Sequence, residues 1–132
     1  QGYLSEMDKF IDQLISAIND DQILPVALLA SLDIDEYLDA RDADEEWLKN
    51  WNAAYRELKN ISDDEIPGYD QLGQLIFSKC AEHVGITDLS CYTAEDFELL
   101  CKADKKGVTS EWLDELKKTY LAGSIPLLEA SR

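Results

Sequence analysis

Four residues in the C-terminal half have the side chains of a zinc site: Cys80, His83, Cys91 and Cys101. Thiolate and imidazole are the ligands that tetrahedral zinc prefers. The spacing, C-x2-H-x7-C-x9-C, matches no common zinc pattern. Cys80 and Cys101 also fall on apolar faces of expected helices, where thiols usually pack as small hydrophobic groups. We therefore expect no metal and no disulfide framework, as is typical of a reduced cytoplasmic protein.

Enzymatic chemistry has no recognisable arrangement in this chain. His83 is the only histidine and could act as a general base, but no Ser or Cys lies in a motif that would make it a nucleophile. Among 28 Asp and Glu residues, a pair of carboxylates is not specific for acid–base catalysis. The sequence therefore predicts a protein that is not an enzyme and needs no cofactor.

The densest group of charged side chains is the segment DIDEYLDARDADEEW, residues 33–47, which contains eight carboxylates and one Arg. A calcium-binding loop of the EF-hand type needs Gly at its sixth position and Glu at its twelfth. Counted from Asp33 these positions hold Leu and Asp, and counted from Asp42 they hold Trp and Ala. Neither frame fits, so we expect no calcium site.

Two explanations remain for this acidic segment. Part of it favours the start of a helix, because Asp42 and Glu45 are spaced as a capping pair and the helix dipole stabilises negative charge in the first turn. The rest is either a solvated surface or a face for a cationic partner, and Tyr beside carboxylates is typical of a protein interface. We favour a partner-binding face made of Asp33, Asp35, Glu36, Tyr37, Asp39, Asp42, Asp44, Glu45 and Glu46.

The elements that must position these side chains are helices. Apolar residues recur at three- and four-residue steps almost throughout the chain, and no segment alternates as a strand would. The expected helical segments are 4–21, 22–32, 33–41, 42–60, 69–85, 93–107 and 109–123. We predict a single compact all-α domain of six to seven helices over residues 1–132, with residues 1–2 attributed to a tag remnant.

Several details of these helices can be predicted from local patterns. Asp33 is expected to cap the helix before it, Thr93 to be an N-cap, and Gly107 and Gly123 to end helices. In segment 33–41 the residues expected to face the core are Ile34, Tyr37 and Leu38. In segment 42–60 they are Trp47, Leu48, Trp51, Tyr55 and Leu58.

The overall charge limits the possible partners. The chain of 132 residues is 45% hydrophobic, which is enough for a core, and its net charge is −16. Residues 1–66 carry 17 acids and 5 bases, a net charge of −12, whereas residues 67–132 carry 11 acids and 7 bases, a net charge of −4. This balance disfavours nucleic acid and anionic membranes and favours a cationic partner that meets the N-terminal half. No membrane span or signal peptide is recognised, so we expect a cytoplasmic protein.

The C-terminal quarter resembles a known class of proteins. The segments TAEDFELLCKADKK and SEWLDELKKTYLAGSIP contain Asp96-Phe97, Trp112-Leu113, Tyr120 and Gly123-x-Ile125-Pro126. They are similar to the C-terminal part of small bacterial immunity proteins, including those of contact-dependent growth inhibition systems. The resemblance implies a small, acidic, cytoplasmic inhibitor of a cognate toxin, often a basic nuclease, and it carries no binding residue across.

Three functional hypotheses follow. The first is an immunity-type inhibitor that covers a cationic, nuclease-like toxin domain with the acidic segment. The second is a regulatory adaptor that docks a basic peptide or helix of another protein. The third is a DNA mimic whose carboxylates imitate phosphate spacing, although the sequence has one acidic cluster and not a long acidic track.

Overall fold

The computed structural model describes residues 6–84 and 87–126, so the suggested tag remnant lies outside the described residues. The elements are α1 (Glu6–Asn19), α2 (Val26–Ser31), α3 (Ile34–Ala43), α4 (Glu45–Leu58), the 3-10 turn η1 (Asp63–Glu65), α5 (Tyr69–Val84), α6 (Thr87–Lys106) and α7 (Glu111–Leu121). The described residues contain no strand, and the prediction of one compact all-α domain with six to seven helices is confirmed.

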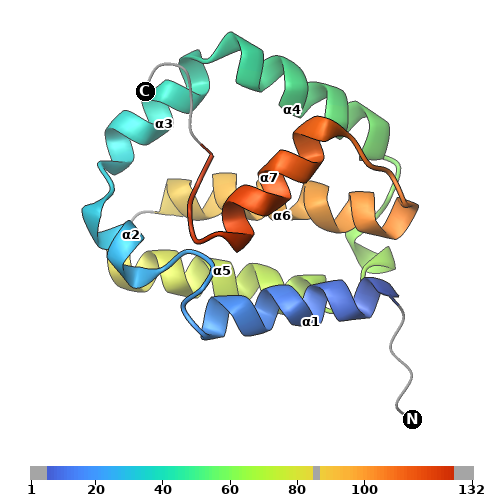
Figure 1. The fold of residues 1–132 in the computed structure, drawn as a ribbon, viewed down its shortest axis with the longest axis horizontal. Coiled ribbons are helices and arrows are strands. Elements are labelled where there is room, and N and C mark those ends of the chain that lie inside the picture. The colour runs from blue at the N-terminus through green and yellow to red at the C-terminus, as the bar shows by residue number, and fades with distance from the viewer. Residues whose placement is uncertain (1–5, 85–86, 127–132) are drawn as a thin grey trace.

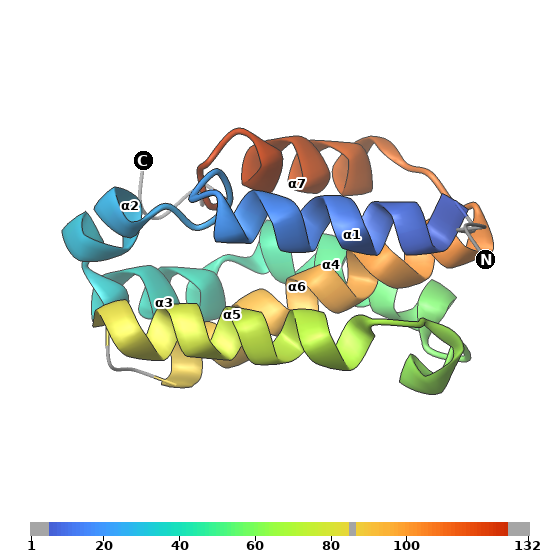
Figure 2. The ribbon, with the colours of Figure 1, turned by 90° about the horizontal axis from the view of Figure 1, so that it is seen from below.

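Helix α6 lies at the centre of the arrangement. In Figure 1, α1 and α5 lie on one side of α6, the arc of α3 and α4 lies on the other, and α7 crosses in front. Figure 2 shows α1 and α5 side by side, with α7 along the other side of α1. Helix α6 packs on α1, α4 and α5, and its buried residues therefore occur on several faces. An element packed in this way can connect distant parts of the chain through its side chains.

The starts of α3 and α4 differ from the predicted ones. Helix α3 continues to Ala43, so Asp42 lies inside it and the prediction that Asp42 caps the next helix is wrong. The N-cap of α4 is Asp44, whose carboxylate accepts a hydrogen bond of 2.9 Å from the Trp47 backbone N–H. Asp33 caps α3 itself, by a 3.1 Å bond from the Glu36 N–H, and not the preceding helix.

Helix α6 begins two turns earlier than expected. Thr93 was predicted as its N-cap, but the helix starts at Thr87 and Thr93 is buried within it. Leu89 and Ser90 are also buried, which shows that the earlier turns pack into the core. Tertiary packing therefore extends the helix beyond its local capping signal.

The core covers only part of the apolar face that the spacing of α4 predicts. Trp47 and Leu58 are buried and Trp51 is partly buried, as expected. Leu48 and Tyr55 were assigned to the core, but their exposed fractions are 38% and 47%. The prediction is wrong for these two residues, which extend the apolar face of α4 beyond the width that the core covers.

The predicted helix stops at Gly107 and Gly123 are confirmed, whereas a third stop, predicted at Gly85, lies outside the described residues. Gly107 and Gly123 have φ angles of +74° and +80°, the left-handed conformation that glycine adopts without steric cost. At the second stop, the Gly123 N–H donates to the Tyr120 carbonyl and the Ser124 N–H donates to the Thr119 carbonyl. These bonds satisfy carbonyl groups that the end of α7 would otherwise leave without partners.

No helix among the described residues combines the length and apolar character needed to cross a membrane.

Candidate functional site

Helix α3 and the first turn of α4 carry a row of exposed carboxylates, which we call the acidic edge. Its members are Asp35, Glu36, Asp39, Asp42, Glu45 and Glu46. Asp33 is also exposed, but its carboxylate is the N-cap of α3. Within the edge, Asp42 accepts a 2.8 Å hydrogen bond from the Tyr92 hydroxyl, and Glu46 accepts a 3.3 Å bond from the Asn50 amide. The edge is therefore partly fixed in place by neighbouring side chains.

Arg41 is the only base in this segment, and it points into the protein. Its exposed fraction is 5%, and its two terminal nitrogens donate to the two oxygens of Asp96 at 2.9 and 3.0 Å. The guanidinium also lies over the rings of Trp47 and Tyr92, 4.8 and 4.9 Å from their centroids. Because its charge is paired inside the fold, Arg41 does not neutralise the acidic edge at the surface.

Asp96 is the centre of a buried polar network. Its exposed fraction is 0%, and it accepts hydrogen bonds from the Trp51 indole N–H at 3.1 Å and from the Tyr120 hydroxyl at 2.5 Å in addition to those from Arg41. The donors come from α3, α4 and α7, and the acceptor is on α6. This single carboxylate therefore fixes three helices against the central one.

Two residues of the predicted binding face lie inside the fold. Tyr37 is 6% exposed and Asp44 is 7% exposed. Tyr37 shares the inner side of α3 with Ile34 and Leu38, as the spacing predicts, so its ring is not part of the surface. Among the predicted residues, the exposed carboxylates are therefore the ones that a partner can reach.

Burial makes two tyrosines close to this network, Tyr37 and Tyr120, hard to ionise. It raises the pKa of Tyr37 to about 12, with a further increase from Asp96 and an opposing effect from Arg41. Burial also raises the pKa of Tyr120 well above its usual value, again reinforced by Asp96. The Tyr37 hydroxyl is buried without a hydrogen-bond partner among the described residues, whereas that of Tyr120 is bound to Asp96.

These pKa values predict a loss of stability at alkaline pH. In the unfolded chain a tyrosine ionises near pH 10, whereas folded Tyr37 keeps its proton to about pH 12. A raised folded pKa gives stability that is complete below pH 10 and is lost between these two values. Tyr37 alone should lower the free energy of unfolding by about 2 kcal/mol at about pH 11.5.

The measurement is urea unfolding at about pH 8 and about pH 11.5. Tyr37→Phe is the matched variant, because it removes the titrating group and an unpaired hydroxyl. Its stability at the lower pH should equal or exceed that of the original chain, and its loss on going to the higher pH should be smaller. An equal loss in both proteins would contradict the assignment to Tyr37.

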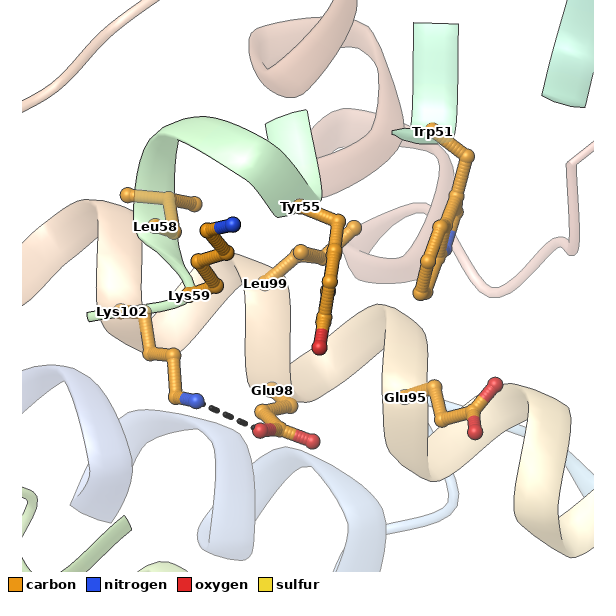
Figure 3. A pocket seen from close by; sticks show the side chains of 8 residues that line it. All are labelled: Trp51, Tyr55, Leu58, Lys59, Glu95, Glu98, Leu99 and Lys102. Atoms are coloured by element: carbon orange, nitrogen blue, oxygen red, sulfur yellow. Dashed lines mark ion pairs between the residues drawn. The ribbon is translucent and has the colours of Figure 1, made fainter. Parts of the chain in front are cut away.

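A groove lies between α4 and α6. Its walls are the rings of Trp51 and Tyr55 with Leu58 and Leu99, and its rim carries Lys59, Glu95, Glu98 and Lys102. The two rings are nearly parallel, with centroids 5.7 Å apart and an interplanar angle of 10°. Figure 3 shows Glu95 on the Trp51 side of the groove and both lysines on the far side of Tyr55. The apolar spacing of α4 does not predict this groove, because it places both aromatic residues in the core.

The thiols of two of the three cysteines pack in the core. Cys80 and Cys101 are buried, as predicted, and burial raises the pKa of both thiols, whereas Cys91 is exposed. No group of three potential metal ligands occurs among the described residues. The side chain of His83, the fourth potential ligand, lies outside the described residues.

Comparison with known proteins gives one finding. The model of the family described as "Immunity protein PIM1" matches residues 13–127, which is most of the chain. No match was found among curated proteins or among solved structures.

Proposed function

This chain belongs to the immunity protein PIM1 family, and from that premise we propose that it inhibits a cognate cationic toxin domain by covering it with the acidic edge. The family implies a toxin as the partner and inhibition without catalysis as the activity. The cationic, nuclease-like character of the toxin and the use of the acidic edge are our own inferences.

The observation that carries the proposal is the position of Arg41. Its charge is paired with Asp96 inside the protein, so the exposed charged side chains of α3 and of the first turn of α4 are all acidic. Like charges placed together on a surface reduce stability. A cationic partner offsets that cost in the complex, because its positive charges pair with the carboxylates. The grouping of carboxylates is therefore expected of a surface that binds such a partner.

The expected partner is a protein with a basic surface, such as a nuclease. Enzymes that grip phosphates carry Lys and Arg around the active site. An acidic inhibitor approaches such a surface faster and rejects other partners by charge repulsion. With a net charge of −16, the chain itself should bind neither nucleic acid nor anionic membranes, and we place its action in the cytoplasm.

The test starts from the gene next to the one for this chain, which we expect to encode the toxin domain. We expect the purified protein to form a one-to-one complex with that domain and to abolish its activity at equimolar concentration. The activity is measured as degradation of nucleic acid over a titration of the inhibitor. A tight complex in which the toxin stays active would contradict inhibition, and an acidic toxin surface at the contact would contradict the electrostatic mechanism.

A further inference from the structure

The exposed side of α4 carries apolar side chains that the core does not use. Glu45, Leu48, Asn52 and Tyr55 are exposed and lie three or four residues apart, so they follow one side of the helix. We call this set the α4 strip. It begins at Glu45, a member of the acidic edge, and ends at Tyr55 beside the groove. A partner that covers the acidic edge therefore meets the groove by continuing along the same helix.

The groove combines a rigid wall with an accessible one. The Trp51 ring is held by the hydrogen bond from its indole N–H to buried Asp96. Tyr55 stands parallel to it and is 47% exposed, so part of its ring is open to a partner. Exposed aromatic side chains at the centre of an interface often contribute most of the binding energy.

The two carboxylates of the groove are not equivalent. Glu98 forms a 2.6 Å ion pair with Lys102, whereas Glu95 has no ion-pair partner among the described residues. Burial and the neighbouring Asp96 raise the pKa of Glu95, because both disfavour its negative charge. A cation supplied by a partner protein would pair with Glu95 at this end of the groove, which lies away from the two lysines (Figure 3).

The volume of the groove is small, about 60 Å³. A single water needs about 10–15 Å³ of such space, so the groove admits only a small group. A guanidinium group has this size, and it is planar, stacks on aromatic rings and forms paired hydrogen bonds with a carboxylate. A lysine ammonium shares the charge but neither the shape nor the stacking.

We propose that the groove receives an arginine side chain of the cognate toxin, whose guanidinium lies against the open edge of the Tyr55 ring and pairs with Glu95. This inference rests on the proposed function, because the toxin supplies the arginine. It adds a specific anchor to the long-range attraction of the acidic edge. The edge then governs the rate of association, and the groove governs how long the complex lasts.

The experiment compares the affinities of Tyr55→Ala and Glu95→Gln for the toxin domain by surface plasmon resonance. We expect each variant to bind at least about tenfold more weakly, mainly through faster dissociation. Phe77→Ala is the matched control for loss of an exposed ring on another helix, and Glu57→Gln is the control for loss of one charge. Both controls should bind like the original chain, and circular dichroism should show all four variants folded.

A double-mutant cycle identifies the occupant. Each arginine of the toxin surface is changed to alanine and measured against the original chain and against Glu95→Gln. One arginine should weaken binding to the original chain and give little further loss with Glu95→Gln, because the two groups contact each other. Absence of such coupling for every toxin arginine would overturn the proposed occupant.

The failure of this inference is distinct from failure of the proposed function. If the original chain neither binds nor inhibits the toxin domain, the proposed function is wrong. If the original chain inhibits it, but Tyr55→Ala and Glu95→Gln bind within twofold of the original, the groove is not the anchor and the proposed function stands.

Discussion

Replacing Asp96 with alanine should destabilise the fold by about 3–5 kcal/mol, the usual cost of removing one partner of a buried ion pair. The change leaves the Arg41 guanidinium buried without its counter-charge, since that side chain is 5% exposed. It also removes the acceptor for the Trp51 indole N–H and the Tyr120 hydroxyl. The loss is a large part of the roughly 5–15 kcal/mol that stabilises a domain of this kind.

Urea unfolding of a small set of variants measures this effect. Arg41→Met should be costly on its own, because it leaves Asp96 buried without its counter-charge. The double variant Arg41→Met/Asp96→Leu should lose less than the sum of the two single changes, because no unpaired charge remains. A change within about 0.5 kcal/mol for Asp96→Ala would mean that the carboxylate does not hold the network together.

The buried network also connects the fold to the proposed binding surfaces. It withdraws Arg41 from the acidic edge, and it fixes the Trp51 ring that forms one wall of the groove. Tyr92, which lies against the Arg41 guanidinium, donates its hydroxyl proton to a hydrogen bond with Asp42 on the edge. A change at Asp96 should therefore disturb binding as well as stability, and binding variants are best chosen outside the network.

The architecture could be predicted from the sequence because its signals are local. The three- and four-residue spacing of Ile34, Tyr37 and Leu38 places them on the inner side of α3, and they are buried. Gly107 and Gly123 end helices because glycine adopts the left-handed backbone conformation without steric cost. This preference is local and does not depend on contacts with distant residues. Signals of this kind were sufficient for the all-α class and for most helix positions.

The errors concern features that depend on distant residues. Arg41 and Asp96 are 55 positions apart, and nothing local pairs them. The spacing does give a signal, since Arg41 lies four residues after buried Tyr37 and so on the inner side of α3. A lone base on the inner side of a helix requires a buried acid, and the apolar stripe of α6 contains one, Asp96.

The faces of α4 could not be predicted for a related reason. Leu48 and Tyr55 fit an apolar helical pattern, but the width of the stripe that the core covers depends on which helices pack against it. The N-cap at Asp42 was misplaced because α3 continues to Ala43, and both Asp42 and Asp44 have suitable side chains. Capping preferences identify candidates, and tertiary packing selects among them.

Reversing Asp35, Glu36 and Asp39 to lysine should slow association with the toxin domain by about tenfold or more at low salt. These three carboxylates are exposed and make no contact with the buried network, so the folded structure should persist. Loss of acidic residues from the first turn of α3 costs at most about 1 kcal/mol for each, and Asp33 and Asp44 are retained as caps. The dissociation rate should change much less than the association rate, because long-range attraction acts mainly before contact.

A matched control separates local attraction from total charge. Reversal of Asp12, Asp20 and Asp64, which are exposed on other parts of the molecule, changes the net charge by the same amount. If the acidic edge steers the toxin, the edge variant should lose most of the salt dependence of its association rate and the control should retain it. Stopped-flow association at low and at high salt measures both. Equal rates for the edge variant, the control and the original chain at low salt would show that the acidic edge is only surface charge.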